Sequence, residues 1–216
     1  MKKWIIAFAV VVFTMIMMPT IAQADYYSEQ KTLYYGLRSG EVQNLQKDLQ
    51  YLGYFTQPDT TTYFGSITKN AVIVFQKNNG LVADGVVGPQ TSRMLKAKKV
   101  VKSAKGYTGV PYAWGGSSPA GFDCSGFTSY VFKRNGFTIP RVSADQYNFG
   151  KWVNKNQLLP GDLVFFTTYK PGPSHVGIYL GNGQFAHASS GAGKITISSM
   201  SNPYYSQRYL GARRVI

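Results

Sequence analysis

Residues 122–132, FDCSGFTSYVF, contain Cys124, the only cysteine in a chain of 216 residues. Phe127 and Val131 recur at helical spacing in this stretch, so we predict a buried helix that ends near residues 135–136. Cys124 then lies at or just inside the N-terminus of that helix. Unpaired backbone N–H groups and the helix dipole favour a thiolate there, so we expect a lowered pKa for this thiol and a nucleophile at neutral pH.

Asp123 precedes this cysteine directly. A carboxylate close to a thiol raises the pKa of the thiol, which opposes the effect of the helix. The opposition weakens if the carboxylate points away, since consecutive side chains on a helix diverge by about 100°. A single cysteine also excludes an intrachain disulfide framework and a cysteine-rich zinc site, and the residues indicate neither a metal nor an organic cofactor.

His175 and His187 are the only imidazoles in the chain, so they are the only histidine candidates for the base that a cysteine nucleophile needs. The alternation of residues 174–180 is typical of a strand, and Gly-Asn-Gly at residues 181–183 predicts a hairpin turn that returns the chain through residues 184–188. Three apolar residues of the first strand are expected to face the core: Val176, Ile178 and Leu180.

A three-residue loop would fix the register of this hairpin. Leu180 would then oppose Gln184. His187 would oppose Gly177, and both imidazoles would fall on one face in diagonal positions. Diagonal Cβ atoms in an antiparallel pair lie roughly 7–8 Å apart or somewhat less, within reach of a ring contact. We therefore predict one histidine as the base and the second as its orienting partner, with Gly177 leaving room between them.

Residues 1–24 have the features of a cleaved secretory signal. Lys2 and Lys3 precede an uncharged, mostly apolar run that ends before Pro19, and Ala-Gln-Ala at residues 22–24 matches a signal-peptidase site. The run has about 15 residues, fewer than the ~20 needed for a membrane-spanning helix. An uncleaved anchor is the alternative. We expect a secreted protein with no membrane span after cleavage, and a monomer, since nothing in the sequence suggests an obligate interface.

Positive charge is concentrated in the second half of the chain. The sequence has 23 Lys and Arg residues against 9 Asp and Glu residues, a formal net charge of +14. Residues 25–97 are nearly neutral at +1, whereas residues 98–216 carry +11. This charge favours a polyanionic partner, with simple solubility as the alternative. Nucleic acid would satisfy the charge, but the export signal favours an anionic bacterial envelope instead.

Three short helices are predicted within residues 36–97, after an extension at residues 25–35. Ser39 and Gly53 are expected to begin and end the first helix. Pro89 is expected to open the third, since proline suits a first helical turn. The inward residues of the first and third helices are expected to be Val42, Leu45, Leu49, Leu52 and Leu95. Those of the second, over residues 67–79, are expected to be Ile67, Ala71, Val74 and Phe75.

Residues 96–105 carry five lysines among alanine, valine and serine. The apolar residues in this stretch, Ala97, Val100, Val101 and Ala104, follow a helical step. We therefore predict the first helix of a second domain, residues 98–216, with a basic outer face. A flexible linker is the alternative.

The order of residues in the first module is distinctive. The relevant residues are Gly40-Glu41-Val42, Leu45-Gln46, Leu49, Leu52-Gly53-Tyr54, Gly65, Thr68, Ala71-Val72, Phe75-Gln76, Gly80-Leu81, Asp84-Gly85, Val87-Gly88-Pro89 and Thr91. They resemble the three-helix type of peptidoglycan-binding domain over residues 36–97, which implies binding to wall polymer. Most of them are core and turn residues, so they indicate the fold better than the ligand, and a plain helical spacer is the alternative.

Five motifs follow in the second segment: PYAWGG at 111–116, FDCSGF at 122–127, PRVSADQ at 140–146, LPGDLVFF at 159–166 and HVGIY at 175–179. In this order they resemble the NlpC/P60 family of cell-wall cysteine peptidases, over residues 98–216. The resemblance implies an α+β, papain-like fold in which helices pack on a central antiparallel sheet. Here a small three-helix peptidoglycan-binding domain precedes that fold.

The resemblance also implies roles. Cys124 resembles the nucleophile, His175 the general base and His187 the third, orienting residue. Family members typically cleave the bond between γ-D-glutamyl and the diamino acid of peptidoglycan stem peptides, through a thioester and without a metal or cofactor. The implied partners are peptidoglycan and anionic wall polymers rather than nucleic acid, and the implied location is the cell wall.

By the same resemblance, Tyr112, Asp123 and Ser125 lie on the substrate side, and Trp114 and Arg141 are further substrate-binding candidates. The Asp123 carboxylate is expected to pair with the free amine of a terminal L-Ala. Arg141 is suited either to a bidentate contact with a stem carboxylate or to a structural ion pair.

Two other functions remain open from the sequence. A non-catalytic wall-binding protein with a degenerate hydrolase fold is disfavoured by the intact Cys124, His175 and His187. An amidase or acyltransferase on the same papain-like fold would keep these residues and act on a different bond.

Overall fold

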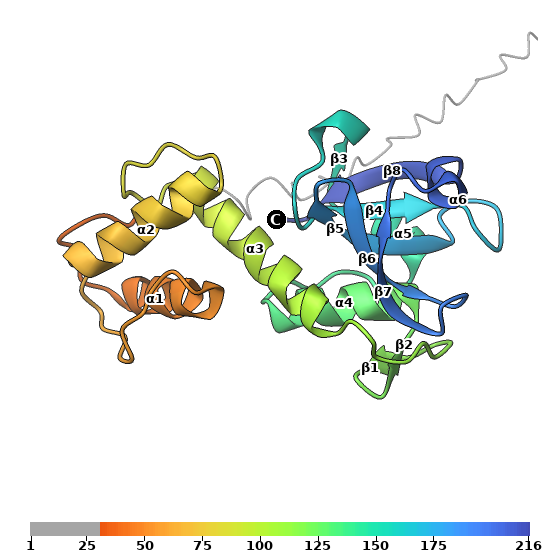
Figure 1. The fold of residues 1–216 in the computed structure, drawn as a ribbon, viewed down its shortest axis with the longest axis horizontal. Helices are drawn as coiled ribbons and strands as arrows, with labels where there is room; N and C mark the ends of the chain where they lie inside the picture. Colours follow the sequence, from red (N-terminus) through yellow and green to blue (C-terminus); the bar gives the residue numbers. More distant parts are fainter. Residues whose placement is uncertain (1–30) are drawn as a thin grey trace, which may run out of the picture.

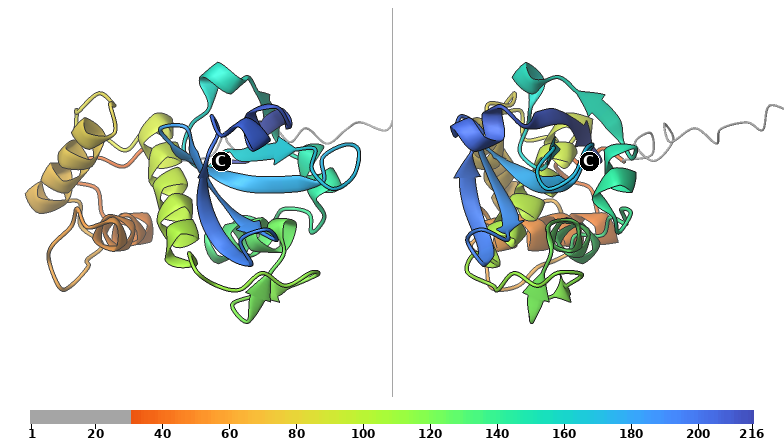
Figure 2. Two further views of the ribbon diagram at one scale, coloured as in Figure 1. Left: turned by 45° about the vertical axis from the view of Figure 1, so that its right-hand side comes forward. Right: turned by 90° about the vertical axis from the view of Figure 1, so that its right-hand side faces the viewer.

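The computed structural model describes residues 31–216. The predicted secretory signal at residues 1–24 lies outside the described residues. Within the described part of the chain, no helix is both long and apolar enough to cross a membrane. A group of helices forms one end of this part and a larger α+β unit forms the other, and one long helix lies between them (Figure 1, Figure 2).

The helices of the first module are α1 (Gly40–Leu52), α2 (Ser66–Asn78) and the first half of α3 (Pro89–Gly106). The predicted ends of α1 are confirmed. The Ser39 hydroxyl accepts a hydrogen bond from the backbone N–H of Val42, and Gly53 ends the helix in the left-handed conformation, with φ 89°. Pro89 opens α3, as predicted.

The predicted inner face of α2 is only partly correct. Ala71 and Phe75 are buried, but Ile67 and Val74 are exposed by 52% and 48%. The buried face instead includes Gln76, whose side-chain amide makes hydrogen bonds to the loop between α2 and α3. Gln76 takes a core position because it provides hydrogen-bond partners for the polar groups of that loop. Hydrophobic spacing alone does not reveal such a polar core residue.

The helix α3 belongs to both modules. Its first half packs Leu95 into the core of the helical module, and its second half packs Val100, Val101 and Ala104 into the core of the α+β unit. The helix predicted over residues 96–105 is therefore the second half of α3 and not a separate helix. No cap or turn interrupts the apolar pattern between the two halves, so the helix continues.

The basic side of α3 is not wholly directed to solvent. The ammonium group of Lys99 forms an ion pair of 2.5 Å with Asp48 of α1. Lys102 donates a hydrogen bond to the backbone carbonyl of Tyr51, the same residue whose ring it faces. Two lysines of the predicted outer face thus hold α3 against α1.

The α+β unit is built on a six-stranded antiparallel sheet with the strand order β3-β8-β4-β5-β6-β7. Its strands are β3 (Lys151–Val153), β4 (Leu163–Phe166), β5 (His175–Gly181), β6 (Gln184–Ser189), β7 (Lys194–Ser199) and β8 (Tyr209–Arg214). The other elements are the ribbon β1 (Ser117–Ser118) and β2 (Gly121–Phe122), the helices α4 (Cys124–Arg134), α5 (Ser143–Tyr147) and α6 (Pro203–Ser206), and a 3₁₀ turn, η2 (Lys155–Gln157). The predicted α+β class is confirmed.

The two faces of the sheet are packed differently. Helices α3 and α4 cover one face, where the predicted inward residues of β5 join Phe127 and Val131 of α4 in one core. The opposite face carries an aromatic cluster that includes Phe166 and Phe185, and Tyr205 of α6 packs against it. The site described below lies between the N-terminus of α4 and the start of β5.

The hairpin of β5 and β6 keeps the predicted register beyond its turn, where Ile178 pairs with Ala186. At the turn itself, Gly181 rather than Leu180 pairs with Gln184, so the prediction is wrong at that position. The turn has two residues, both with positive φ, a form that matches the twist of the strands. A bulge before Gly181 takes up the extra residue, and both imidazoles still fall on one face.

Candidate active site

Cys124 is the first residue of α4, as predicted. Asp123 caps the helix, because its carboxylate accepts a hydrogen bond of 2.6 Å from the backbone N–H of Gly126. A methyl group on Gly126 would lie 2.0 Å from the backbone carbonyl oxygen of Gly116, so only glycine lets this loop approach the first turn of the helix. The motif around the cysteine is thus fixed by backbone contacts as well as by chemistry.

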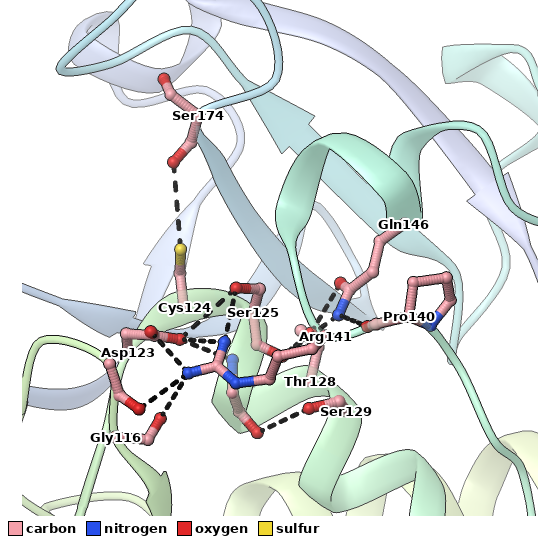
Figure 3. A network of polar contacts seen from close by, with 12 residues as sticks. Gly116, Asp123, Cys124, Ser125, Thr128, Ser129, Pro140, Arg141, Gln146 and Ser174 are labelled. Atoms are coloured by element: carbon pink, nitrogen blue, oxygen red, sulfur yellow. Dashed lines mark hydrogen bonds and ion pairs between the residues drawn. The ribbon is translucent and has the colours of Figure 1, made fainter.

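The sulfur of Cys124 faces the start of β5. It lies 3.9 Å from the backbone carbonyl oxygen of Ser174 (Figure 3). The backbone N–H of Val176 lowers the pKa of this thiol. Ser174, the residue directly before His175, thus contacts the sulfur, and Cys124 and His175 line the same cavity.

The two imidazoles form a hydrogen-bonded pair. Nε2 of His175 lies 2.9 Å from Nδ1 of His187, with the ring planes at 89° to each other. His187 is fully buried, whereas His175 is partly exposed at the cavity. The prediction that the hairpin brings the two rings together is confirmed. Since His175 uses Nε2 for this contact, its Nδ1 is the nitrogen available to a proton from Cys124.

Gly177 permits this pairing. A methyl group at Gly177 would lie 2.8 Å from the backbone carbonyl oxygen of Ala186 and 3.2 Å from Cβ of His187. The backbone of β6 cannot retreat from such a group without breaking the ladder. The space predicted beside Gly177 is therefore filled by β6 itself.

The expected lowering of the Cys124 pKa is not what the structure shows. Burial raises the pKa of the Cys124 thiol, and the Asp123 carboxylate raises it further. The backbone N–H groups of Val176, Ser125 and Cys124 itself lower it, but by less than burial raises it. The helix N-terminus acts in the predicted direction and is outweighed by desolvation. Cys124 therefore rests as a thiol rather than a thiolate.

Both histidines are neutral at physiological pH. Burial lowers the pKa of His175 to about 4. Burial and the neighbouring His175 lower the pKa of His187 to about 2. A neutral imidazole beside a neutral thiol is the protonation state in which His175 can act as a base.

A cavity of about 410 Å³ gathers most of the predicted site residues. The predicted residues in its lining are Tyr112, Trp114, Asp123, Cys124, Ser125, Arg141 and His175. His187 lies behind His175 and outside the lining, as suits an orienting residue. One open site therefore combines the predicted nucleophile, the predicted base and all five predicted substrate-side residues.

Arg141 makes the structural ion pair that the sequence analysis held open. Its guanidinium contacts both carboxylate oxygens of Asp123, at 3.0 and 2.7 Å, and also the Ser125 hydroxyl at 3.0 Å (Figure 3). It also donates to the backbone carbonyls of Gly115 and Gly116. Arg141 thereby holds the loop before β1 against the first turn of α4.

Several residues of the site escaped the sequence analysis. The Trp114 indole is 74% exposed and meets the Tyr169 ring edge to face at 5.5 Å, so the loop between β4 and β5 forms one wall of the cavity. On the buried side, Ser198 and Tyr205 contact His187. The register of β6 with β7 would have placed Ser198 near His187, but no turn motif in the sequence fixes that register.

Comparison with known families assigns both parts of the chain. The NlpC/P60 family model matches residues 109–214, and the model of a peptidoglycan binding domain matches residues 38–95. The two matches correspond to the α+β unit and to the helical module. Residues 96–108, the second half of α3 and the start of the loop that follows it, lie between the two matches.

Two curated relatives resemble the second module. Gamma-DL-glutamyl hydrolase of Bacillus subtilis is 47% identical over 118 residues, which is 53% of this chain and 28% of that protein. Murein DD-endopeptidase MepS/Murein LD-carboxypeptidase of Escherichia coli is 48% identical over 111 residues, 51% of this chain and 58% of that protein. The chain thus spans less than two thirds of either relative.

A solved structure agrees in fold as well as in sequence. The P60 domain of an antigen from M. avium subspecies paratuberculosis is 39% identical and has a TM-score of 0.51. The alignment covers 58% of this chain and 98% of that domain. The chain belongs to the NlpC/P60 family, with a peptidoglycan-binding domain before the family's α+β unit.

Replacement of Gly177 by alanine tests the close packing behind the histidines. We expect Gly177→Ala to lower the free energy of unfolding by about 1–3 kcal/mol, because the added methyl group overlaps the backbone of β6. Urea denaturation measures the change. Gly106→Ala is the matched control, since a methyl group there meets no atom within 4 Å. Equal unfolding midpoints for both variants would contradict the packing described.

The rate of Cys124 alkylation tests the protonation state of the site. Since burial raises the pKa of this thiol, the thiolate fraction at pH 7 is smaller than that of a free thiol, whose pKa is about 8.5. We expect the rate with iodoacetamide to rise with pH and to reach half its maximum at a higher pH than the rate for glutathione. A rate already maximal at pH 6 would show a thiolate–imidazolium pair instead.

Proposed function

We propose that this chain is a secreted peptidoglycan hydrolase that cuts stem peptides with Cys124 as the nucleophile. The observation that carries the proposal is the hydrogen-bonded pair of His175 and His187, placed beside a cysteine that opens a helix and lines a cavity. The names of the two curated relatives, a γ-glutamyl hydrolase and a murein endopeptidase, support peptidoglycan stem peptides as the substrate class. The proposed bond joins γ-D-glutamyl to the diamino acid.

The reaction begins with the neutral thiol. As the sulfur of Cys124 attacks the scissile carbonyl carbon, its proton passes to Nδ1 of His175, and Nε2–H of His175 donates to His187. The imidazolium then donates that proton to the leaving amine, which gives a thioester on Cys124. Water, activated by the neutral His175, hydrolyses the thioester and restores the thiol.

The first turn of α4 provides donors for the oxyanion. The backbone N–H groups of Cys124 and Ser125 lower the pKa of the thiol in the resting site, so they act on the negative charge that forms on the sulfur. These groups belong to the helix N-terminus, where the backbone has no acceptor of its own. As negative charge moves from sulfur to the carbonyl oxygen, the same donors are placed to stabilise it.

The substrate lies along the cavity wall formed by Tyr112, Trp114 and the Asp123–Arg141 pair. Asp123 accepts from Gly126 through one carboxylate oxygen and from Arg141 through both. We assign to it the free amine of a terminal L-Ala, with Ser125 beside it. Because Arg141 offsets part of the Asp123 charge, this contact works chiefly as a directed hydrogen bond rather than as long-range attraction.

The helical module keeps the enzyme on its polymer in this proposal. It is nearly neutral, whereas the catalytic unit is strongly basic, so anionic wall polymers are further partners of the second module. Since α3 is shared by both cores, the two modules are joined rigidly and not by a loose tether. The enzyme acts as a monomer at the cell wall.

Digestion of purified sacculi tests the proposed function. We expect the wild-type chain to release fragments that begin with the diamino acid and to leave L-Ala-D-Glu on the glycan, as measured by mass spectrometry. Because L-Ala in a glycan-linked stem has no free amine for Asp123, we expect free stem peptides to be cut faster than these stems. Cys124→Ala should reduce product formation by at least about 1,000-fold, because the nucleophile is lost. The thermal unfolding of both proteins controls for folding.

Each other function gives a different result in this digestion. Identical product profiles for wild type and Cys124→Ala would show a non-catalytic wall-binding protein. Whole stem peptides released from the glycan would show an amidase. Fragments cut between stems would show a cross-link endopeptidase. Any of these profiles would overturn the proposed bond.

Asp123→Asn tests the amine contact, since asparagine also caps helices well and keeps the side-chain shape. We expect this variant to lower kcat/KM about 10-fold for stem peptides with a free L-Ala amine and to leave peptides with an acetylated amine unchanged. Equal losses for both peptides would show that Asp123 serves only the helix cap and Arg141.

A further inference from the structure

Two hydroxyl groups lie beyond His187, and the mechanism above uses neither of them. Nε2 of His187 is 2.9 Å from the Ser198 hydroxyl oxygen and 3.3 Å from the Tyr205 hydroxyl oxygen. The His187 side chain is fully buried. These two hydroxyls are therefore the partners that satisfy Nε2 in the interior.

Two separate elements of the fold bring these hydroxyls close to the His187 ring. In the pairing of β6 with β7, Ser198 faces Phe185, so it lies on the same face of the sheet as His187 and diagonal to it. Tyr205 of α6 lies with its ring nearly parallel to that of His175, at 24°, and edge-on to that of His187. Two different elements thus converge on one imidazole.

Hydrogen bonding links the protonation of the two histidines. His175 accepts the proton of Cys124 at Nδ1 only if its own hydrogen is on Nε2. That Nε2–H must then donate to Nδ1 of His187, which requires the His187 hydrogen to be on Nε2. In the opposite arrangement, Nδ1–H of His187 donates to Nε2 of His175, and the hydrogen of His175 is on Nδ1. His175 then has no free nitrogen to accept the proton of Cys124.

We propose that Ser198, supported by Tyr205, is a positioning residue that holds His187 in the Nε2–H form and thereby keeps His175 ready to act as a base. This inference rests on the proposed function, and it extends the Cys124–His175–His187 series by two residues. Ser198 has the shorter contact and accepts the hydrogen from His187 Nε2. The Ser198 and Ser189 hydroxyls also act on the hydroxyl of Tyr205, since both lower the pKa of Tyr205.

The polar residues around His187 extend to the cavity that holds Cys124. Ser189 and Tyr205 both line it, as does His175. Charge that develops on His175 during the reaction can be shared along His187 and Ser198 without exposing His187 to water. The proton itself stays on His175, so Ser198 and Tyr205 orient and polarise but do not exchange protons with the substrate.

Five single variants and one double variant separate this role from simple packing. Ser198→Ala and Tyr205→Phe remove the two hydroxyls, singly and together. Ser199→Ala is the matched serine control, because Ser199 is next on the same strand, is exposed, and its hydroxyl bonds only with Ser201 among the described residues. Tyr209→Phe is the matched tyrosine control, because the Tyr209 hydroxyl is buried without a hydrogen-bond partner among the described residues. Ser198→Thr restores a hydroxyl.

Nitrogen NMR of the imidazoles shows directly which ring nitrogen carries the hydrogen. The chain has only two histidines to assign. In the wild-type full-length chain we expect both rings to carry hydrogen on Nε2 at pH 7. In Ser198→Ala/Tyr205→Phe we expect a mixture of ring forms, with kcat for peptidoglycan fragments reduced about 10- to 100-fold and KM unchanged. Ser198→Thr and the two controls should behave as wild type.

Two results would overturn the inference. One is hydrogen on Nδ1 of His187 in the wild-type chain. The other is a folded double variant with unchanged ring forms and unchanged kcat. If the wild-type chain fails to cleave peptidoglycan at all, the proposed function fails, while the NMR result still decides whether Ser198 and Tyr205 set the form of His187.

Discussion

The hydrogen bond between His175 and His187 is the constraint on which the site depends. It requires both rings on one face of the β5–β6 hairpin, which follows from the register and from the bulge before Gly181. It also requires a glycine at position 177, since any side chain there would push β6 away. The base is thus positioned by the backbone of a buried sheet, and the sheet tolerates little change in its spacing.

Desolvation and the helix N-terminus compete at the nucleophile. Burial keeps Cys124 protonated and both imidazoles neutral, although three backbone N–H groups pull the thiol pKa the other way. In the proposed reaction, the N–H groups of Cys124 and Ser125 serve the oxyanion once charge has left the sulfur. The Asp123–Arg141 pair locks the first turn in place. In that reaction Cys124 and His175 are uncharged at rest and become charged only as the reaction proceeds, which favours transition-state over ground-state stabilisation.

The sequence predicted the parts of this account that depend on local chemistry. Cys124 at a helix start, the inward face of β5 and the shared face of the histidines follow from spacing and from one turn motif. The exposed Ile67 and Val74, the continuous α3 and the raised thiol pKa were not predicted, because they depend on distant partners. The side-chain amide of Gln76 bonds to a loop, the two halves of α3 pack into two different cores, and burial removes water from the sulfur of Cys124. None of these contacts leaves a pattern in the neighbouring sequence.

Trapping the thioester tests the central claim most directly. The chain is mixed with a stem peptide, quenched in acid within milliseconds to seconds, digested and analysed by mass spectrometry. The account predicts an acyl group, the L-Ala-D-Glu part of the substrate, on the sulfur of the peptide that contains Cys124. An active enzyme that carries no adduct there, or carries the acyl group on a hydroxyl elsewhere, would contradict the mechanism.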